Sequence, residues 1–236
     1  AAEPVPFPAH RHAAGHPGPQ AGKVVVAVGH LDQLQHRLEQ RCGLRADHHH
    51  LIADGLDYPA VQSKLPEFVS DIDLDLAILN AGVLGKIQPM AKAELDELKN
   101  TMELNLWSQK VLLDTLLSNN KLETVIGISS GAAVNGNMGW SGYSLSKAAF
   151  NMLIQLYAKE FEDTKFYAFA PGLVDTNMQD YLWEVSEEKY PSVKKLHDAR
   201  GTENMPKPEE FAKKFESALP KLLKLESGEF ADLRKI

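Results

Sequence analysis

The chain has 236 residues, 44% of them hydrophobic, and a formal net charge of −7. This size suits one α/β domain with a full core, and the acidic balance argues against a nucleic-acid partner. No apolar run is long enough to span a bilayer, no secretory leader is visible, and the single Cys42 excludes an internal disulfide. We therefore expect a cytoplasmic protein without a membrane partner.

From residue 23 onward, short apolar runs typical of buried strands alternate with stretches of helical periodicity. Strands are expected at 23–29, 49–53, 74–79, 122–129, 165–170 and 229–233. Helices are expected at 31–41, 58–70, 91–97, 98–117, 141–162 and 208–225. This alternation predicts a single doubly wound, Rossmann-type α/β domain over residues 1–236, with a mainly parallel sheet and helices on both faces.

Four polar or turn residues directly follow predicted strands, and they are Asp54, Asn80, Ser130 and Pro171. Ligands of open parallel sheets bind at the carboxyl ends of the strands. We therefore expect these four residues to line one crevice. The histidines at 48–50 cannot converge on one ion from a strand, so no metal site is expected.

The stretch 130–147 carries three side chains suited to passing a proton to a carbonyl group. Tyr143 follows Ser130 by thirteen residues and precedes Lys147 by four, so on a helix Tyr143 and Lys147 share one face. Because an ammonium group favours the phenolate, Lys147 is expected to lower the pKa of Tyr143 from its ordinary value near ~10. The Ser130 hydroxyl can hydrogen-bond a substrate oxygen as charge develops on it.

Together with Asn80-Ala81-Gly82, Asn105 and Pro171-Gly172, these residues resemble the short-chain dehydrogenase/reductase family over about residues 23 to 236. The resemblance implies an NAD(P)H-dependent carbonyl reductase in which Tyr143 is the general acid. It implies that Ser130 polarises the carbonyl, that Lys147 also holds the nicotinamide ribose, and that Asn105 anchors a water linking Lys147 to solvent. The implied cofactor-binding residues are Asp54, Asn80, Ala81, Gly82, Tyr143, Lys147, Pro171, Gly172, Val174 and Thr176.

Four shorter segments are similar to the sepiapterin reductase and benzil reductase branch of that family: 139–140, 146–149, 170–179 and 227–232. The branch reduces a carbonyl beside a second carbonyl or imine. By this resemblance the substrate is a dicarbonyl or a pterin-like ketone, Asp232 anchors a pterin ring, and Trp140 forms an apolar side of the site. Alternatively, Asp232 is a surface charge at the end of the last strand, and an apolar diketone needs no such anchor.

The Gly-rich turn that the family uses to bind the cofactor pyrophosphate is not recognisable. Counting back from Asn80 puts it near residues 6–14, and prolines interrupt any strand or helix across residues 4–19. Residues 1–22 are thus atypical. Three explanations stay open: a frameshift or misreading before about residue 23, a divergent loop that still binds phosphate, or loss of the loop. In the last case the chain would be a non-catalytic binding protein.

The predicted cofactor preference depends on the end of the run 23–29, which we interpret as the second strand of the fold. NAD-preferring relatives place an acidic residue there to bind the ribose 2′-hydroxyl. Here Gly29 and His30 follow, so NADP(H) is favoured, with NAD(H) as the alternative.

Two further expectations concern the segment 176–206 and assembly. The segment is long for a connection, which predicts a mobile lid or, alternatively, two short packed helices.

The helices 98–117 and 141–162 carry apolar positions beyond one core stripe: Leu106, Trp107, Leu112, Leu113, Phe150, Leu153, Ile154 and Tyr157. By the family resemblance these helices pair in a homodimer. The alternative is that the same residues fill the core of the monomer.

Overall fold

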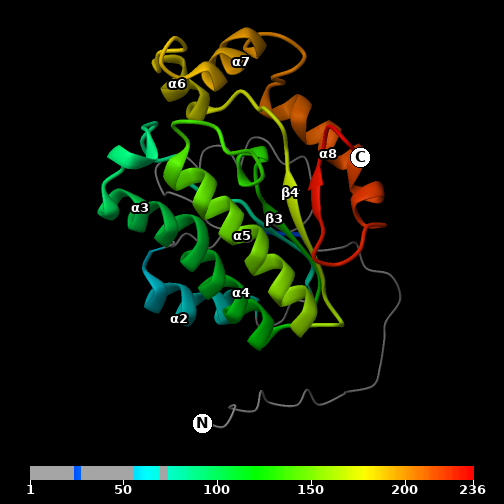
Figure 1. Cartoon of the computed structure of the whole chain (residues 1–236). Coiled ribbons are helices and arrows are strands. Elements are labelled where there is room, and N and C mark those ends of the chain that lie inside the picture. Colours follow the sequence, from blue (N-terminus) through cyan, green and yellow to red (C-terminus); the bar gives the residue numbers. More distant parts are fainter. Residues whose placement is uncertain (1–23, 28–55, 70–73) are drawn as a thin grey trace, which may run out of the picture.

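The computed structural model describes residues 24–27, 56–69 and 74–236 (Figure 1). Its centre is a five-stranded parallel sheet in the order β1-β2-β3-β4-β5. The strands are β1 Val24–Ala27, β2 Leu74–Leu79, β3 Leu122–Ile128, β4 Lys165–Ala170 and β5 Phe230–Asp232. The predicted α/β class with a parallel sheet is confirmed. The strand predicted at 49–53 and the helix predicted at 31–41 lie outside the described residues.

The α-helices are α2 Tyr58–Val69, α3 Leu95–Met102, α4 Ser108–Asn119, α5 Ser141–Glu160, α6 Asn177–Trp183, α7 Pro191–Ala199 and α8 Pro208–Leu222. Short 3-10 turns lie at η1 Met90–Lys92 and η3 Gly131–Ala133, and the π-helical segment η2 Glu103–Trp107 joins α3 to α4. The boundary predicted between residues 97 and 98 is therefore wrong. Glu97 and Leu98 are both good helix formers, and neither ends a helix. None of the helices in the described ranges is long and apolar enough to cross a membrane.

Helices cover both faces of the sheet: α2, α4 and α5 lie on one face and α8 on the other (Figure 1). Side chains of β4 alternate between these layers, as strand geometry requires. Phe166 and Ala168 pack in the cluster formed with α4 and α5, whereas Tyr167 and Phe169 pack in the cluster that contains α8. Burial on both faces explains why this strand is an unbroken apolar run in the sequence.

Helix α5 lies close against β3 because Gly127 has no side chain. A Cβ atom at Gly127 would be 2.6 Å from Cε1 and Cζ of Phe150 and 3.1 Å from Cδ1 of Ile154. Phe150 is 1% exposed, so its ring fills the space over the glycine. The absence of a side chain at Gly127 thus determines how closely α5, which carries Tyr143 and Lys147, packs against β3.

Strand β1 pairs with β2, with Ala27 opposite Leu79. In the doubly wound strand order 3-2-1-4-5-6, the strand beside the fourth is the first. If 23–29 is the second strand and 49–53 the third, then 74–79 is the fourth, and its neighbour in this order is the first strand rather than the second. The observed pairing of β1 with β2 therefore differs from the interpretation of 23–29 as the second strand. Gly29 and His30 lie outside the described residues. The preference for NADP(H) remains a prediction, but it no longer has this support.

Candidate active site

The carboxyl ends of the parallel strands lie at one edge of the sheet, and α6 and α7 cover this edge (Figure 1). Asn80 directly follows β2, and Pro171 directly follows β4. Ser130 comes two residues after the end of β3, and Asp232 is the last residue of β5. The structure therefore brings the polar residues at the strand ends to a single edge. Asp54 lies outside the described residues.

Tyr143 and Lys147 lie one turn apart on α5, with 8% and 4% of their surfaces exposed. The hydroxyl of Tyr143 is hydrogen-bonded to Ser130. Ser130 caps the η3 turn, and its Oγ accepts a hydrogen bond from the backbone N–H of Ala132 at 3.1 Å. This bond orients the serine hydroxyl beside the tyrosine.

Burial raises the pKa of Tyr143 above its ordinary value, and the hydrogen bond with Ser130 opposes this rise. The expectation that Lys147 lowers the pKa of Tyr143 therefore differs from the direction in the structure. The physical reason is that removing a phenolate from water costs more than the one hydrogen bond returns. A raised pKa keeps the phenol protonated near neutrality, as a proton donor must be.

The ammonium group of Lys147 lies beneath the edge of the sheet. Its Nζ donates to the carbonyl oxygen of Ile128 at 2.7 Å and lies 5.4 Å from the centroid of the Phe150 ring. Burial lowers the pKa of Lys147 to about 8. A Cβ atom at Gly82 would be 3.3 Å from this Nζ and 3.3 Å from Oδ1 of Asn105. Glycine therefore lets the loop after β2 pass directly over both side chains.

Asn105 is fully buried in the π-helical segment η2. Its Oδ1 accepts from the N–H of Val83 at 2.7 Å, and its Nδ2 donates to the carbonyl of Val83 at 2.8 Å and to Oγ of Ser146 at 2.9 Å. The side chain thus links the loop after β2 to α5, with both amide hydrogens engaged. Sequence reasoning missed Ser146, although its place next to Lys147 was a signal. The water-anchoring role of Asn105 stays a prediction.

The segment 176–206 forms the two short helices α6 and α7, and both pack over Tyr143. Four of its residues share a buried cluster with Tyr143: Leu182, Tyr190, Val193 and Leu196. Trp140 contacts both Tyr143 and helix α7. Its ring centroid is 6.1 Å from that of Tyr143, and its Nε1 donates to Oγ of Ser192 at 2.8 Å. The alternative of packed helices describes this structure, and opening of a lid stays a prediction.

The loop between β4 and α6 contains the remaining predicted cofactor residues. Gly172 has a φ of +79°, a conformation that favours glycine over residues with a side chain. Val174 and Thr176 are half-buried, and Thr176 occupies the N-cap position of α6 without a side-chain capping bond. The loop therefore starts at the carboxyl edge of the sheet and leads directly into the helices that cover this edge.

Asp232 is 6% exposed, so it is not the surface charge of the alternative expectation. Its Oδ1 accepts from Nε of Arg234 at 2.8 Å and its Oδ2 from Nη2 at 2.5 Å. This pairing holds the pKa of Asp232 below its ordinary value. Sequence reasoning missed Arg234, whose signal was a cation two residues after an acidic strand end.

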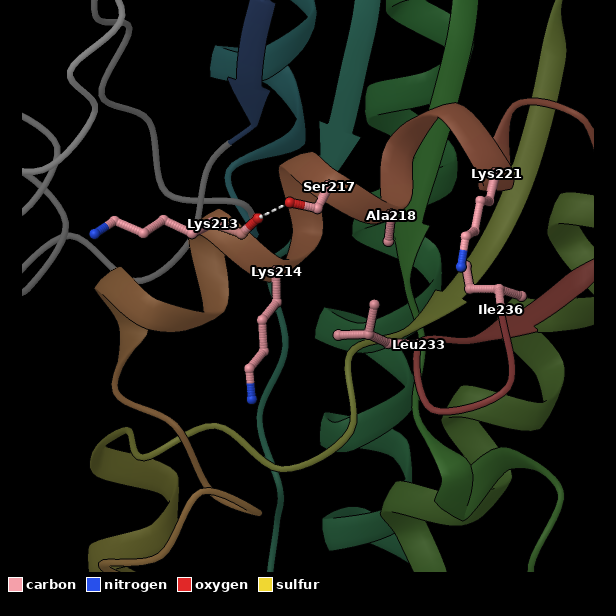
Figure 2. Close-up of a pocket in the computed structure, with 7 residues that line it drawn as sticks. All are labelled: Lys213, Lys214, Ser217, Ala218, Lys221, Leu233 and Ile236. Carbon is pink, nitrogen blue, oxygen red and sulfur yellow. Dashed lines mark hydrogen bonds between the residues drawn. The ribbon is translucent and has the colours of Figure 1, made fainter.

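A separate pocket of about 430 Å³ lies along α8 (Figure 2). Its lining includes Lys213, Lys214 and Lys221 from the helix and Leu233 and Ile236 from the C-terminal segment. The lining contains none of the predicted site residues. Within the described ranges, no group of three His, Cys, Asp or Glu side chains could hold a metal ion.

Comparison with known proteins gives a consistent assignment. The family model for short chain dehydrogenase matches residues 20–187. Benzil reductase ((S)-benzoin forming) of Bacillus cereus is 31% identical over 176 residues, which cover 69% of this chain and 71% of that protein. The enzyme of the same name from Bacillus subtilis is 30% identical over 196 residues, covering 77% and 79%. Sepiapterin reductase of Rattus norvegicus is 37% identical over 118 residues, covering 47% and 45%.

Solved structures agree with these sequence matches. The KRED1-Pglu enzyme superposes with a TM-score of 0.66 at 25% identity, covering 76% of this chain and 78% of that chain. A short chain dehydrogenases/reductase from Saccharomyces cerevisiae gives a TM-score of 0.67 at 22% identity, covering 78% and 75%. Since the family match spans strands β1 to β4, the loops after β2, β3 and β4, and the helix that carries Tyr143 and Lys147, the chain belongs to the short chain dehydrogenase family and is an NAD(P)-dependent oxidoreductase.

Proposed function

We propose that this protein reduces a carbonyl group that lies beside a second carbonyl or imine, and that the product is an alcohol. The observation that carries the proposal is the Tyr143 hydroxyl, buried, protonated and hydrogen-bonded to Ser130 at the carboxyl edge of the sheet. Its similarity to two benzil reductases supports the substrate class, because benzil is an aromatic diketone. The similarity to sepiapterin reductase makes a pterin-like ketone the second substrate to test.

The residues of this edge fit a nicotinamide dinucleotide. Gly82 has no side chain above Lys147, and Gly172 adopts a turn that brings backbone to the same edge. We propose that residues 80–82 contact the adenosine ribose, that Lys147 holds the nicotinamide ribose hydroxyls, and that Pro171, Gly172, Val174 and Thr176 face the nicotinamide end. The bound cofactor supplies a hydride to the carbonyl carbon. A comparison of kcat/KM with NADPH and NADH tests the predicted preference for NADP(H).

The side chains of this protein supply the proton and stabilise developing charge. Tyr143 donates its phenolic proton to the carbonyl oxygen while Ser130 donates a hydrogen bond to the same oxygen. The Lys147 ammonium favours the resulting phenolate electrostatically. Because burial lowers the pKa of Lys147 to about 8, it can release and regain a proton near neutrality. Asn105 is a positioning residue that holds the loop after β2 against α5.

The variant Tyr143→Phe tests this assignment, since it removes the proton donor and keeps the ring in its apolar cluster. We expect kcat on benzil to fall by roughly 10²- to 10⁴-fold, the usual contribution of a general acid. The control is Tyr190→Phe, the same change at another buried position of that cluster, which should keep most of the activity. A Tyr143→Phe variant with wild-type kcat would contradict the mechanism.

We also propose a homodimer through α4 and α5. Most of the apolar residues expected to pair instead fill the monomer core: Leu106, Leu112, Leu113, Phe150, Ile154 and Tyr157. Other residues of α5 remain exposed, namely Leu145 at 50%, Met152 at 53% and Leu156 at 52%. Their spacing of seven and four places them on one side of the helix. Such an exposed apolar stripe suits a self-complementary interface.

A further inference from the structure

Arg234 lies between two loops of the candidate active site. An ideal Cβ atom at Gly131, the residue after Ser130, would be 3.4 Å from Nη2 of Arg234. A Cβ atom at Gly172 would be 3.7 Å from Cδ and 3.9 Å from Nε of the same side chain. The Arg234 side chain therefore lies next to both the turn that carries Ser130 and the loop proposed to face the nicotinamide. The preceding residue, Leu233, lines the separate pocket along α8 (Figure 2).

The pairing with Asp232 orients the guanidinium and leaves part of it available. Arginine has five N–H donors in a planar fork, and Asp232 accepts from Nε and Nη2. The Nη1 group and the second Nη2 hydrogen are not used by this pair. The Arg234 side chain is 61% exposed, whereas Asp232 is 6% exposed. The carboxylate is thus a buried support, and the guanidinium is the group that a ligand can reach.

The charge of this pair distinguishes between ligands. Asp232 and Arg234 together are close to neutral, so the pair presents fixed N–H donors with little net charge. A carboxylate would gain N–H contacts but would also approach the carboxylate of Asp232. A neutral carbonyl oxygen gains the same contacts without that repulsion. The pair therefore favours a ketone oxygen over an anion.

We propose that Arg234 binds the second carbonyl oxygen of a vicinal dicarbonyl substrate, with Asp232 as its positioning residue. This inference rests on the proposed reduction at Tyr143. The proposal places the neighbouring carbonyl on the side of Gly131, because this residue directly follows Ser130 and the guanidinium lies beside it. Arg234 thereby selects substrates with two adjacent carbonyl groups.

The test compares benzil with deoxybenzoin, a ketone of similar shape in which a methylene replaces the second carbonyl. In Arg234→Met, kcat/KM for benzil should fall about tenfold or more, as expected for loss of a hydrogen bond to a charged group. The value for deoxybenzoin should change little, so the ratio between the two substrates falls. The two ketones differ in intrinsic reactivity, but this difference is the same in wild type and in Arg234→Met. It therefore cancels when the benzil-to-deoxybenzoin ratios of the two proteins are compared. The control Lys235→Met removes an exposed cation one residue away and should preserve the ratio.

Two further variants cover the case in which Arg234→Met leaves the buried carboxylate unpaired and fails to fold. The double variant Asp232→Asn/Arg234→Met removes both charges and should show the same fall in the ratio. Asp232→Asn alone removes the carboxylate that compensates the positive charge of Arg234, so residues 232 and 234 together carry a net positive charge. It should therefore raise kcat/KM for the oxo acid benzoylformate relative to benzil, a shift that a purely structural aspartate would not produce.

The outcomes separate this inference from the proposed function. A wild-type protein that reduces neither benzil nor sepiapterin contradicts the proposed function. An active wild type, an inactive Tyr143→Phe and an unchanged substrate ratio in the folded Arg234 variants contradict only the role of Arg234. A selective loss of benzoylformate reduction in Arg234→Met would show an anion site and would overturn the inference as well.

Discussion

Replacing the buried lysine of the site should stabilise the protein while abolishing its activity. Burial lowers the pKa of Lys147 from 10.5 to about 8, and the side chain is 4% exposed. This difference corresponds to a cost of about 3 kcal/mol for holding the ammonium in the folded state. Lys147→Met removes that cost but leaves the Ile128 carbonyl without its 2.7 Å bond, which costs roughly 1 kcal/mol. We expect a net gain of about 2 kcal/mol at pH 7.

The sign of the pH dependence follows from the protons bound in each state. Below pH 8 both the folded and the unfolded chain carry the lysine proton, so the cost is constant. Between pH 8 and 10.5 the unfolded chain keeps a proton that the folded chain has lost. Wild-type stability should therefore rise through this window relative to Lys147→Met, and the advantage of the variant should shrink.

Urea unfolding of both proteins without cofactor, at several pH values from 7 to 10, measures this difference. Lys159→Met is the control, because it makes the same change at an exposed position of α5. It should follow the wild-type profile. Parallel profiles for wild type and Lys147→Met across the window would refute the argument, because they would show that burial does not depress the lysine.

Other predictions concern packing, the helices over the site and assembly. Gly127→Ala should destabilise the protein by about 1–3 kcal/mol through its 2.6 Å clash with Phe150, and Phe150→Leu should recover part of this loss in a double-mutant urea cycle. Ser192→Ala removes the acceptor of the Trp140 indole N–H, so limited proteolysis within residues 176–206 should become faster and cofactor should slow it; unchanged cleavage would contradict a lid. Met152→Glu places a charge in the exposed stripe of α5 and should give a monomer mass in light scattering where wild type gives a dimer; a monomeric wild type would refute the interface.

Local sequence pattern was sufficient for the elements with sharp boundaries. The strands at Leu74–Leu79 and Lys165–Ala170 have the predicted limits, because each is an apolar run flanked by polar or turn residues. The helix Ser141–Glu160 begins where predicted, and its spacing brings Tyr143 and Lys147 to one side. The break predicted at residue 97 failed, because neighbouring helical segments joined by a π-helical turn have no local stop signal.

The residue types and their spacing by themselves determined the α/β class, the family and a group of proton-transferring side chains at the strand ends. Only the tertiary structure decided which groups share an environment. Burial from several elements raises the pKa of Tyr143 despite Ser130, and pairing beside β2 puts Val24–Ala27 in the place of the first strand. Asp232 acquires Arg234 as its partner, and the guanidinium reaches the loops after β3 and β4, because β5 ends beside β4. Asp232 and Arg234 are only two residues apart, but Gly131 and Gly172 are far from Arg234 in the chain, so no local sequence pattern encodes their approach to the guanidinium.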